Sequence, residues 1–244
     1  MTWFSRALIC ALILIGSLCA FLATDLVLPA IPTLPEALGG GVEEGQFVLA
    51  SFIAGGAAGL LIFGAISWRF DRRKLLLSTM AVFGAVSLAC TFVTSIWPLI
   101  GLRFFQGFFS MVPAVIGPGI LRQMFSDKGA TKAIGLLGSL EALAPALGPI
   151  AGAGLLALGG WTLSFTVLGV MGLALAGLLL FLPFLPPLRF PAFSDFSVGR
   201  FPAYLDLPWR LAFSSKLRQS RHRRRPHGLG AIKSQHPRVG LGRQ

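Results

Sequence analysis

The chain has 244 residues, of which 55% are hydrophobic and 12% are charged, about half the charged share of a typical water-soluble protein. This composition excludes both a water-soluble globular domain and a wholly disordered chain. The formal net charge of +12 is divided unevenly, because residues 1–188 carry +2 and residues 189–244 carry +10. The two parts therefore require separate interpretations.

Six apolar segments are each long enough to cross a bilayer as a helix, which takes about 20 residues. They are residues 7–28, 46–67, 75–95, 98–121, 131–157 and 162–185. The first is too long for the apolar region of a signal peptide and no small-residue cleavage site follows it, so we expect an uncleaved helix. The sequence thus predicts an all-α polytopic membrane protein, with six transmembrane helices in a bundle over residues 1–186.

The basic residues outside the spans give an orientation. Eight precede the first span or follow the second and fourth, and none follows the first, third or fifth. The positive-inside rule then predicts that the N-terminus and, after six spans, the tail are cytoplasmic. The connection with Glu36, Glu43 and Glu44 is expected outside.

Cysteine and histidine usage argues against a metal site or a disulfide framework. Cys10, Cys19 and Cys90 lie in apolar runs, where we expect buried small side chains. The spans contain no His, and the chain has no GxxxxGK[ST] phosphate-binding loop. The sequence predicts that the protein is not an enzyme and has no metal site and no cofactor.

Three side chains inside the spans are formally charged: Asp25, Arg103 and Glu141. Because such a charge costs at least ~2.5 kcal/mol, each is expected to have a partner, a water-filled cavity or a proton. Asp25 and Arg103 both fall in the outer half of the bundle, where they could share an ion pair or a cavity. Glu141 lies ~15 Å into the fifth span and could exchange a proton near the midplane. Purely structural roles remain open: a helix cap for Asp25, backbone carbonyl partners for Arg103, and a hydrogen bond across helices for Glu141.

Four sequence motifs follow the spans in order. Asp25 to Pro32 matches D-x-x-x-P-x-x-P, and the stretch around Arg103 matches l-x-x-x-R-x-x-q-G. A pattern G-x8-G-x3-G-P-x2-G-G is matched in the fifth span with Ala144 and Ala153 in place of two glycines. Its remaining positions are Gly135, Gly148, Pro149 and Gly152.

The connection after the second span carries the remaining motif. It resembles G-x-L-a-D-r-x-G-r-r/k-x-x-L and retains Gly64, Arg69, Arg72 and Arg73. Trp68 stands where the pattern has Asp, and Asp71 stands where it has Gly.

Together these stretches resemble the N-terminal half of a major facilitator superfamily transporter. The branch that they match most is that of the drug:proton antiporters of the bicyclomycin and chloramphenicol resistance kind. In this family the Asp that Trp68 replaces takes part in a charge-assisted cytoplasmic latch, which Asp71 would replace poorly.

The resemblance covers residues 5–186 and implies one half of a twelve-helix fold with a substrate site between the halves. It implies proton-coupled efflux of small molecules, with Asp25, Arg103 and Glu141 as candidates for proton and substrate coupling. The implied partners are a small-molecule substrate, protons, membrane lipid and a second half or dimer partner. A single half is expected to be inactive by itself, in a bacterial inner membrane.

The tail, residues 187–244, contains no further span and is rich in Arg, Pro and Ser. We expect it to be disordered and cytoplasmic. It could bind anionic lipid. Without a fold motif, nucleic-acid binding is the weaker interpretation. Out-of-frame sequence is the interpretation that we favour. The alternative for the whole chain is a non-transporting membrane remnant, or a scaffold with a lipid-binding tail.

Overall fold

The computed structural model describes residues 3–181, and the elements in that range are all helical. Five helical stretches are long and apolar enough to cross a membrane. They are Arg6–Leu38, Val42–Ile66, Arg72–Phe92, Ile96–Met124 and Asp127–Phe181. The first four correspond to the first four predicted spans, and the fifth joins the last two. The expected tail at 187–244 lies outside the described residues.

The first stretch ends in two short helical turns. It consists of α1 (Trp3–Asp25), the 3-10 helix η1 (Leu28–Thr33) and α2 (Leu34–Leu38). Two glycines with positive φ, Gly39 and Gly40, then end α2, since this backbone conformation favours glycine. The chain enters α3 (Val42–Ile66), where the Gly41 amide donates to the Glu44 carboxylate at 2.8 Å.

Proline interrupts the fourth stretch. Before this stretch along the chain lie the 3-10 helix η2 (Ser67–Arg69), α4 (Arg72–Ala89) and the 3-10 helix η3 (Cys90–Phe92). The fourth stretch itself consists of α5 (Ile96–Ser110) and α6 (Val112–Met124), which are separated at Met111. Pro113 has no N–H to donate to the Phe109 carbonyl, and its ring crowds that group, which disfavours a continuous α-helix here.

The last stretch contains α7 (Asp127–Glu141) and α8 (Ala144–Phe181). Pro145 accounts for the break between them, because it removes the donor that the Glu141 carbonyl would accept. Within α8 the backbone leaves helical geometry at Gly159 and Gly160, and Gly160 has φ 71°. This is the glycine pair that separates the fifth and sixth predicted spans.

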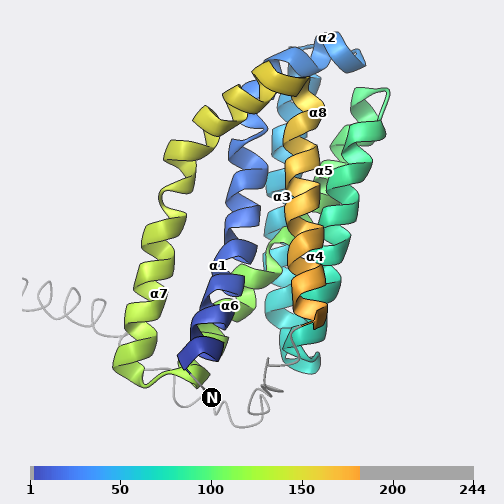
Figure 1. Ribbon diagram of the computed structural model, residues 1–244. Helices are drawn as coiled ribbons and strands as arrows, with labels where there is room; N and C mark the ends of the chain where they lie inside the picture. The colour runs from blue at the N-terminus through green and yellow to red at the C-terminus, as the bar shows by residue number, and fades with distance from the viewer. Residues whose placement is uncertain (1–2, 182–244) are drawn as a thin grey trace, which may run out of the picture. The chain divides into compact units, whose positions relative to one another are not determined.

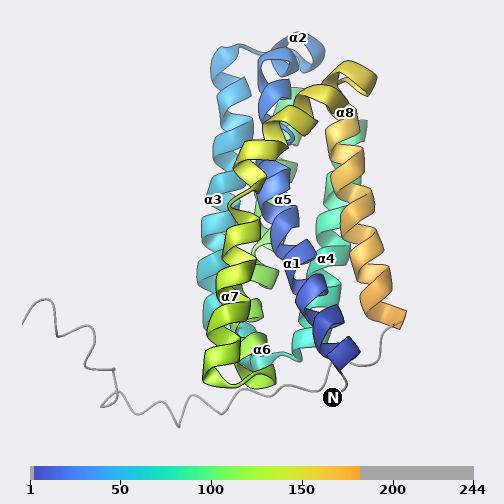
Figure 2. The same ribbon diagram turned by 60° about the vertical axis from the view of Figure 1, so that its left-hand side comes forward.

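The chain reverses direction at this glycine pair. A Cβ on Gly152 would meet the carbonyl oxygen of Leu26, and the Ser164 hydroxyl donates to that same oxygen at 3.2 Å. In a straight helix residues 152 and 164 would be about 18 Å apart along the axis. Both can reach one carbonyl only if the chain doubles back, as the reversal between the yellow first part of α8 and its orange remainder shows (Figures 1 and 2).

Glycines set two close helix pairs. A Cβ at Gly55 or Gly59 of α3 would meet a carbonyl oxygen of α5, and one at Gly107 of α5 would meet the Phe52 carbonyl. Gly84 of α4 lies in the same way against α8. Small residues allow this close approach of backbones in a bilayer, where dispersion contacts drive association.

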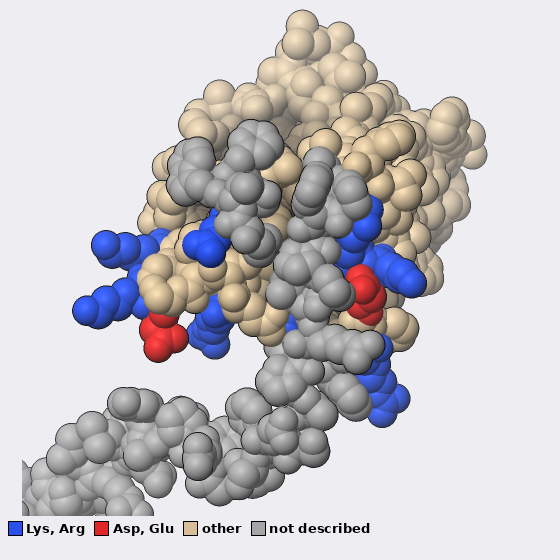
Figure 3. All heavy atoms as spheres, turned by 60° about the horizontal axis from the view of Figure 1, so that its bottom comes forward, with Lys and Arg blue, Asp and Glu red and all other residues tan. Residues whose placement is uncertain are grey.

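The surface differs between the sides and one end of the bundle. Large apolar side chains are exposed along the helices, for example Leu61 (74%) and Ile150 (71%), as expected for a surface that contacts lipid. Lys and Arg side chains gather at the end where α7 begins (Figure 3). We call this the basic end. The turns η1 and α2 lie at the opposite end (Figure 1).

Candidate functional site

Arg103 of α5 is fully enclosed by the bundle, with 0% of its surface exposed. Its Nη1 donates to the carbonyl of Ala23 in α1 at 2.9 Å, and its Nε donates to the carbonyl of Val48 in α3 at 3.3 Å. Its guanidinium carbon lies 4.2 Å from the ring centroid of Phe52, which is a cation–π contact. Arg103 therefore joins three helices through backbone carbonyls, the structural role left open by the sequence.

A chain of hydrogen bonds leads from Arg103 to α4. Nη1 of Arg103 also donates to Oε1 of Gln106 at 2.7 Å, and Nε2 of Gln106 donates to the Ser87 hydroxyl at 2.7 Å. Ser87 in turn donates to the carbonyl of Phe83 at 2.7 Å. Only Nη2 of Arg103 has no hydrogen-bond partner among the described residues. The guanidinium group thus keeps a free donor edge in a place that excludes solvent.

Asp25 is half-buried at the end of α1. Its Oδ2 is buried and accepts no hydrogen bond from the described residues. Asp25 and Arg103 form no ion pair in this part of the chain; Arg103 binds the carbonyl of Ala23, two residues before Asp25. The structure therefore brings both groups to the end of α1 without joining them.

The glycine motif of the fifth span lies partly against this carboxylate. A Cβ on Gly148 would meet the Cβ of Asp25, and one on Gly152 would meet the Leu26 carbonyl. Pro149 lies within α8 beside them, where the backbone stays helical. Gly135, by contrast, has open space where its Cβ would be. Two of the motif glycines thus allow α8 to approach Asp25.

Glu141 is the last residue of α7 and is half-buried. It lies four residues after the buried Leu137 and so shares its helix face. Its side chain makes no hydrogen bond or ion pair within residues 3–181. Glu141 is not brought into contact with Arg103, and the hydrogen bond across helices that the sequence left open is not formed here.

The loop motif at the basic end has two structural functions. The Asp71 carboxylate accepts from the backbone amides of Arg73 and Lys74 at 2.9 and 3.1 Å, so it caps the N-terminus of α4. The buried Arg72 donates to Gln123 of α6 at 3.3 Å. Gly64 has open space around its Cβ position, and Arg69 is exposed.

Arg73 makes a contact that sequence reasoning missed. Its guanidinium group donates to the carbonyls of Leu179 and Leu180 at 3.0–3.2 Å. Arg73 therefore links α4 to α8 at residues 179 and 180. Sequence reasoning also missed Gln106, Ser87 and Gln123. The hydrogen-bond partners of such polar residues are defined only once the helices are packed.

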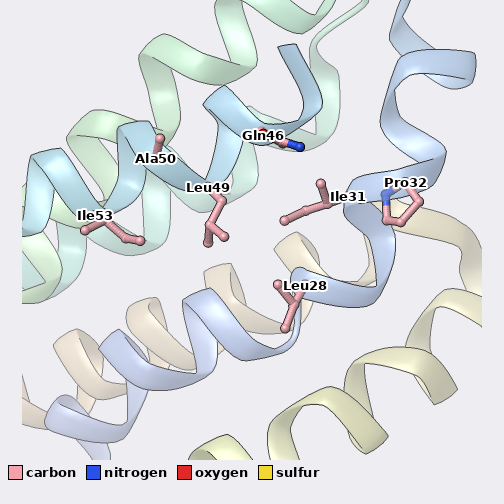
Figure 4. Close-up of a pocket in the computed structure, with 7 residues that line it drawn as sticks. All are labelled: Leu28, Ile31, Pro32, Gln46, Leu49, Ala50 and Ile53. Carbon is pink, nitrogen blue, oxygen red and sulfur yellow. The ribbon is translucent and has the colours of Figure 1, made fainter. Parts of the chain in front are cut away.

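A pocket of about 520 Å³ opens between α3 and η1. Its lining side chains come from these two elements and are apolar except for Gln46 (Figure 4). They are Leu28, Ile31, Pro32, Gln46, Leu49, Ala50 and Ile53. The volume is in the range of small-molecule sites. Leu28 places the pocket three residues beyond Asp25 along the chain.

Residues 13–223 match the family model of the Major Facilitator Superfamily. The chain belongs to this superfamily. The matched region of this major facilitator chain runs past residue 186, the expected boundary between bundle and tail. The family indicates a transporter rather than an enzyme, in agreement with the sequence analysis.

Among its relatives are drug-resistance proteins. The multidrug resistance protein MdtM of Salmonella typhimurium is 32% identical over 67% of this chain and 40% of its own length. A bicyclomycin resistance protein homolog of Haemophilus influenzae is 31% identical over 65% and 40%. The chloramphenicol resistance protein of Pseudomonas aeruginosa is 32% identical over 63% and 37%. These relatives confirm the predicted resemblance to the drug:proton antiporter branch.

The chain spans about 40% of the length of these curated relatives. With its apolar helices, the family match indicates a multi-pass protein of the bacterial inner membrane.

Proposed function

We propose that this chain is one half-unit of a proton-coupled efflux transporter for small molecules. The observation that carries the proposal is the enclosed Arg103 near the end of α1 that carries Asp25. Among the described residues, neither Nη2 of Arg103 nor Oδ2 of Asp25 has a hydrogen-bond partner. Charged groups inside spans are rare and usually belong to an ion or substrate pathway. Two such groups without a mutual ion pair leave room for a change of partner.

The coupling step proceeds through the charge of Asp25. When Asp25 is ionised, its carboxylate attracts the guanidinium group of Arg103, whose Nη2 is free to donate. When Asp25 takes up a proton, that attraction falls. Because Arg103 is bound to carbonyls of α1 and α3, the change alters the preferred packing of α1, α3 and α5. Protonation would thus bias which side of the transporter is open.

Glu141 is proposed as a second proton site. It lies at a helix break, and broken helices with free carbonyls often line ion or substrate sites in transporters. Within residues 3–181 Glu141 forms no hydrogen bond or ion pair with Arg103, so its proposed role is separate from that of Asp25.

The six-span topology is also part of the proposal. The stretch 127–181 would be about 80 Å long as a straight helix, more than twice the thickness of a bilayer core. Its reversal at Gly159 and Gly160 supports two crossings. The basic residues gathered at one end support a cytoplasmic N-terminus.

A small-molecule substrate is supported by the pocket beyond Asp25 and by the names of the relatives. In transporters of this architecture the substrate site lies between two repeats. Since the chain spans about 40% of its relatives, we infer that transport requires a second six-helix unit, from a second copy or another polypeptide.

The test is chloramphenicol efflux from drug-sensitive bacteria that express this chain together with the C-terminal half of the Salmonella relative. We expect export that a protonophore abolishes, and loss of coupling in Asp25→Asn and Arg103→Gln. Glu141→Gln should change the pH dependence. Export that survives both neutralising substitutions would contradict the roles of Asp25 and Arg103. A correctly inserted chain without export would favour the non-transporting alternative.

A further inference from the structure

The hydrogen-bond chain behind Arg103 has one possible direction. Arginine only donates, so Gln106 must present Oε1 to it and Nε2 to the other side. The Ser87 hydroxyl accepts from Nε2 and sends its own proton to the Phe83 carbonyl, which only accepts. If the Gln106 amide turned over, a donor would face Arg103. The direction is therefore fixed at both ends.

We propose that Ser87 is a positioning residue that orients Arg103 through Gln106. Ser87, Gln106 and Arg103 are each 0% exposed, so a lost partner is not replaced by bulk water. With Nη1 held by Gln106 and Ala23, and Nε held by Val48, Nη2 is the edge that stays free within residues 3–181. This inference rests on the proposed function, because it assigns Ser87 to the coupling step at Arg103.

Loss of the Ser87 hydroxyl has a defined consequence. Nε2 of Gln106 would remain without an acceptor in an apolar interior, which is costly. The Gln106 amide would lower its free energy by turning away from this position, and its Oε1 would then leave Nη1 of Arg103. The guanidinium group would keep only its carbonyl partners and could rotate, so its free edge would no longer be defined.

The first experiment compares Ser87→Ala with Ser110→Ala in the efflux assay. Ser110 is also 0% exposed, and among the described residues its hydroxyl bonds only to the Gly107 carbonyl of its own helix. Both variants lose one local hydrogen bond, but only Ser87→Ala loses the contact with Gln106. We expect roughly tenfold weaker export and a displaced pH profile for Ser87→Ala. Export by Ser110→Ala should stay near wild type. Ser87→Thr keeps a hydroxyl and should retain the wild-type pH profile. Equal profiles for the two alanine variants would overturn the proposal.

The second experiment does not need transport, and so separates this proposal from the proposed function. Melting temperatures are measured for Ser87→Ala, Arg103→Lys and the double variant, each with Gln106 and with Gln106→Met. Among the described residues Ser87 and Arg103 form no hydrogen bond with each other, so coupling between them requires the Gln106 amide. We expect the shifts in melting temperature to be non-additive when Gln106 is present and additive in the Gln106→Met background. Additive shifts in both backgrounds would refute the relay even if the chain transports.

Discussion

Backbone carbonyl groups, rather than a carboxylate, hold Arg103 inside the bundle. A buried guanidinium group must be hydrogen-bonded, because an isolated buried charge is very costly. The sequence predicts that residue 103 needs partners and permits carbonyls among them. It does not identify the carbonyls of Ala23 and Val48, because these depend on how α1 and α3 pack around α5.

Asp71 illustrates a substitution whose effect is local. The family motif has Gly at this position, and here the carboxylate caps α4. The Asp71 carboxylate already accepts hydrogen bonds from two backbone amides. Its direct role is therefore to stabilise the start of α4 rather than to form a latch to another element.

Removal of this cap should lower stability. Asp71→Ala leaves the amides of Arg73 and Lys74 without their acceptor and should cost about 1 kcal/mol. Asp71→Asn keeps a capping oxygen and should remain close to wild type. Thermal unfolding of the purified protein measures the difference. Equal melting temperatures for wild type and Asp71→Ala would contradict the capping role.

At the scale of helices, glycine contacts and proline breaks determine the packing. The sequence predicts that Gly-rich helices pack closely, but not that Gly55, Gly59 and Gly107 belong to one helix pair. The breaks at Met111 and after Glu141 were not expected from hydropathy, since apolar runs continue through Pro113 and Pro145. Hydropathy measures burial in lipid, whereas these breaks arise from a missing N–H donor.

Two glycines of α5 offer a matched test of helix contact. A Cβ at Gly107 would meet the Phe52 carbonyl of α3, whereas a Cβ at Gly101 has open space. Gly107→Ala should force α3 and α5 apart and cost about 1–3 kcal/mol. Gly101→Ala should be neutral or slightly stabilising, because Ala favours helix. The melting temperatures of the two variants check this, and a Gly107→Ala protein as stable as Gly101→Ala would refute the close contact.

At the scale of the whole molecule, the turn at Gly159 and Gly160 bears on whether residues 127–181 would cross the membrane once or twice. By length and composition alone, residues 127–181 form one apolar helical stretch. Its reversal becomes evident only because Gly152 and Ser164 both reach Leu26.

Thiol labelling tests the proposed sidedness. In a background without the native cysteines, Glu43→Cys and Gly159→Cys should react with an impermeant maleimide added to intact cells. Ser126→Cys, at the basic end, should react only after the membrane is opened. These expectations follow from two crossings between residues 127 and 181 and a cytoplasmic N-terminus. If Ser126→Cys but not Gly159→Cys were labelled in intact cells, the orientation would be the opposite of the one proposed.

The sequence by itself determined the class of protein, the apolar helical stretches, the glycine turn and the family, because these depend on local composition and short motifs. Tertiary structure decided the contacts: carbonyl partners for Arg103, the Gln106–Ser87 chain, Gly148 against Asp25, and Arg73 on the Leu179 carbonyl of α8. These contacts join residues distant in sequence. Such polar partners and close approaches exist only once the helices are packed, since each depends on distances of a few ångströms between separate elements.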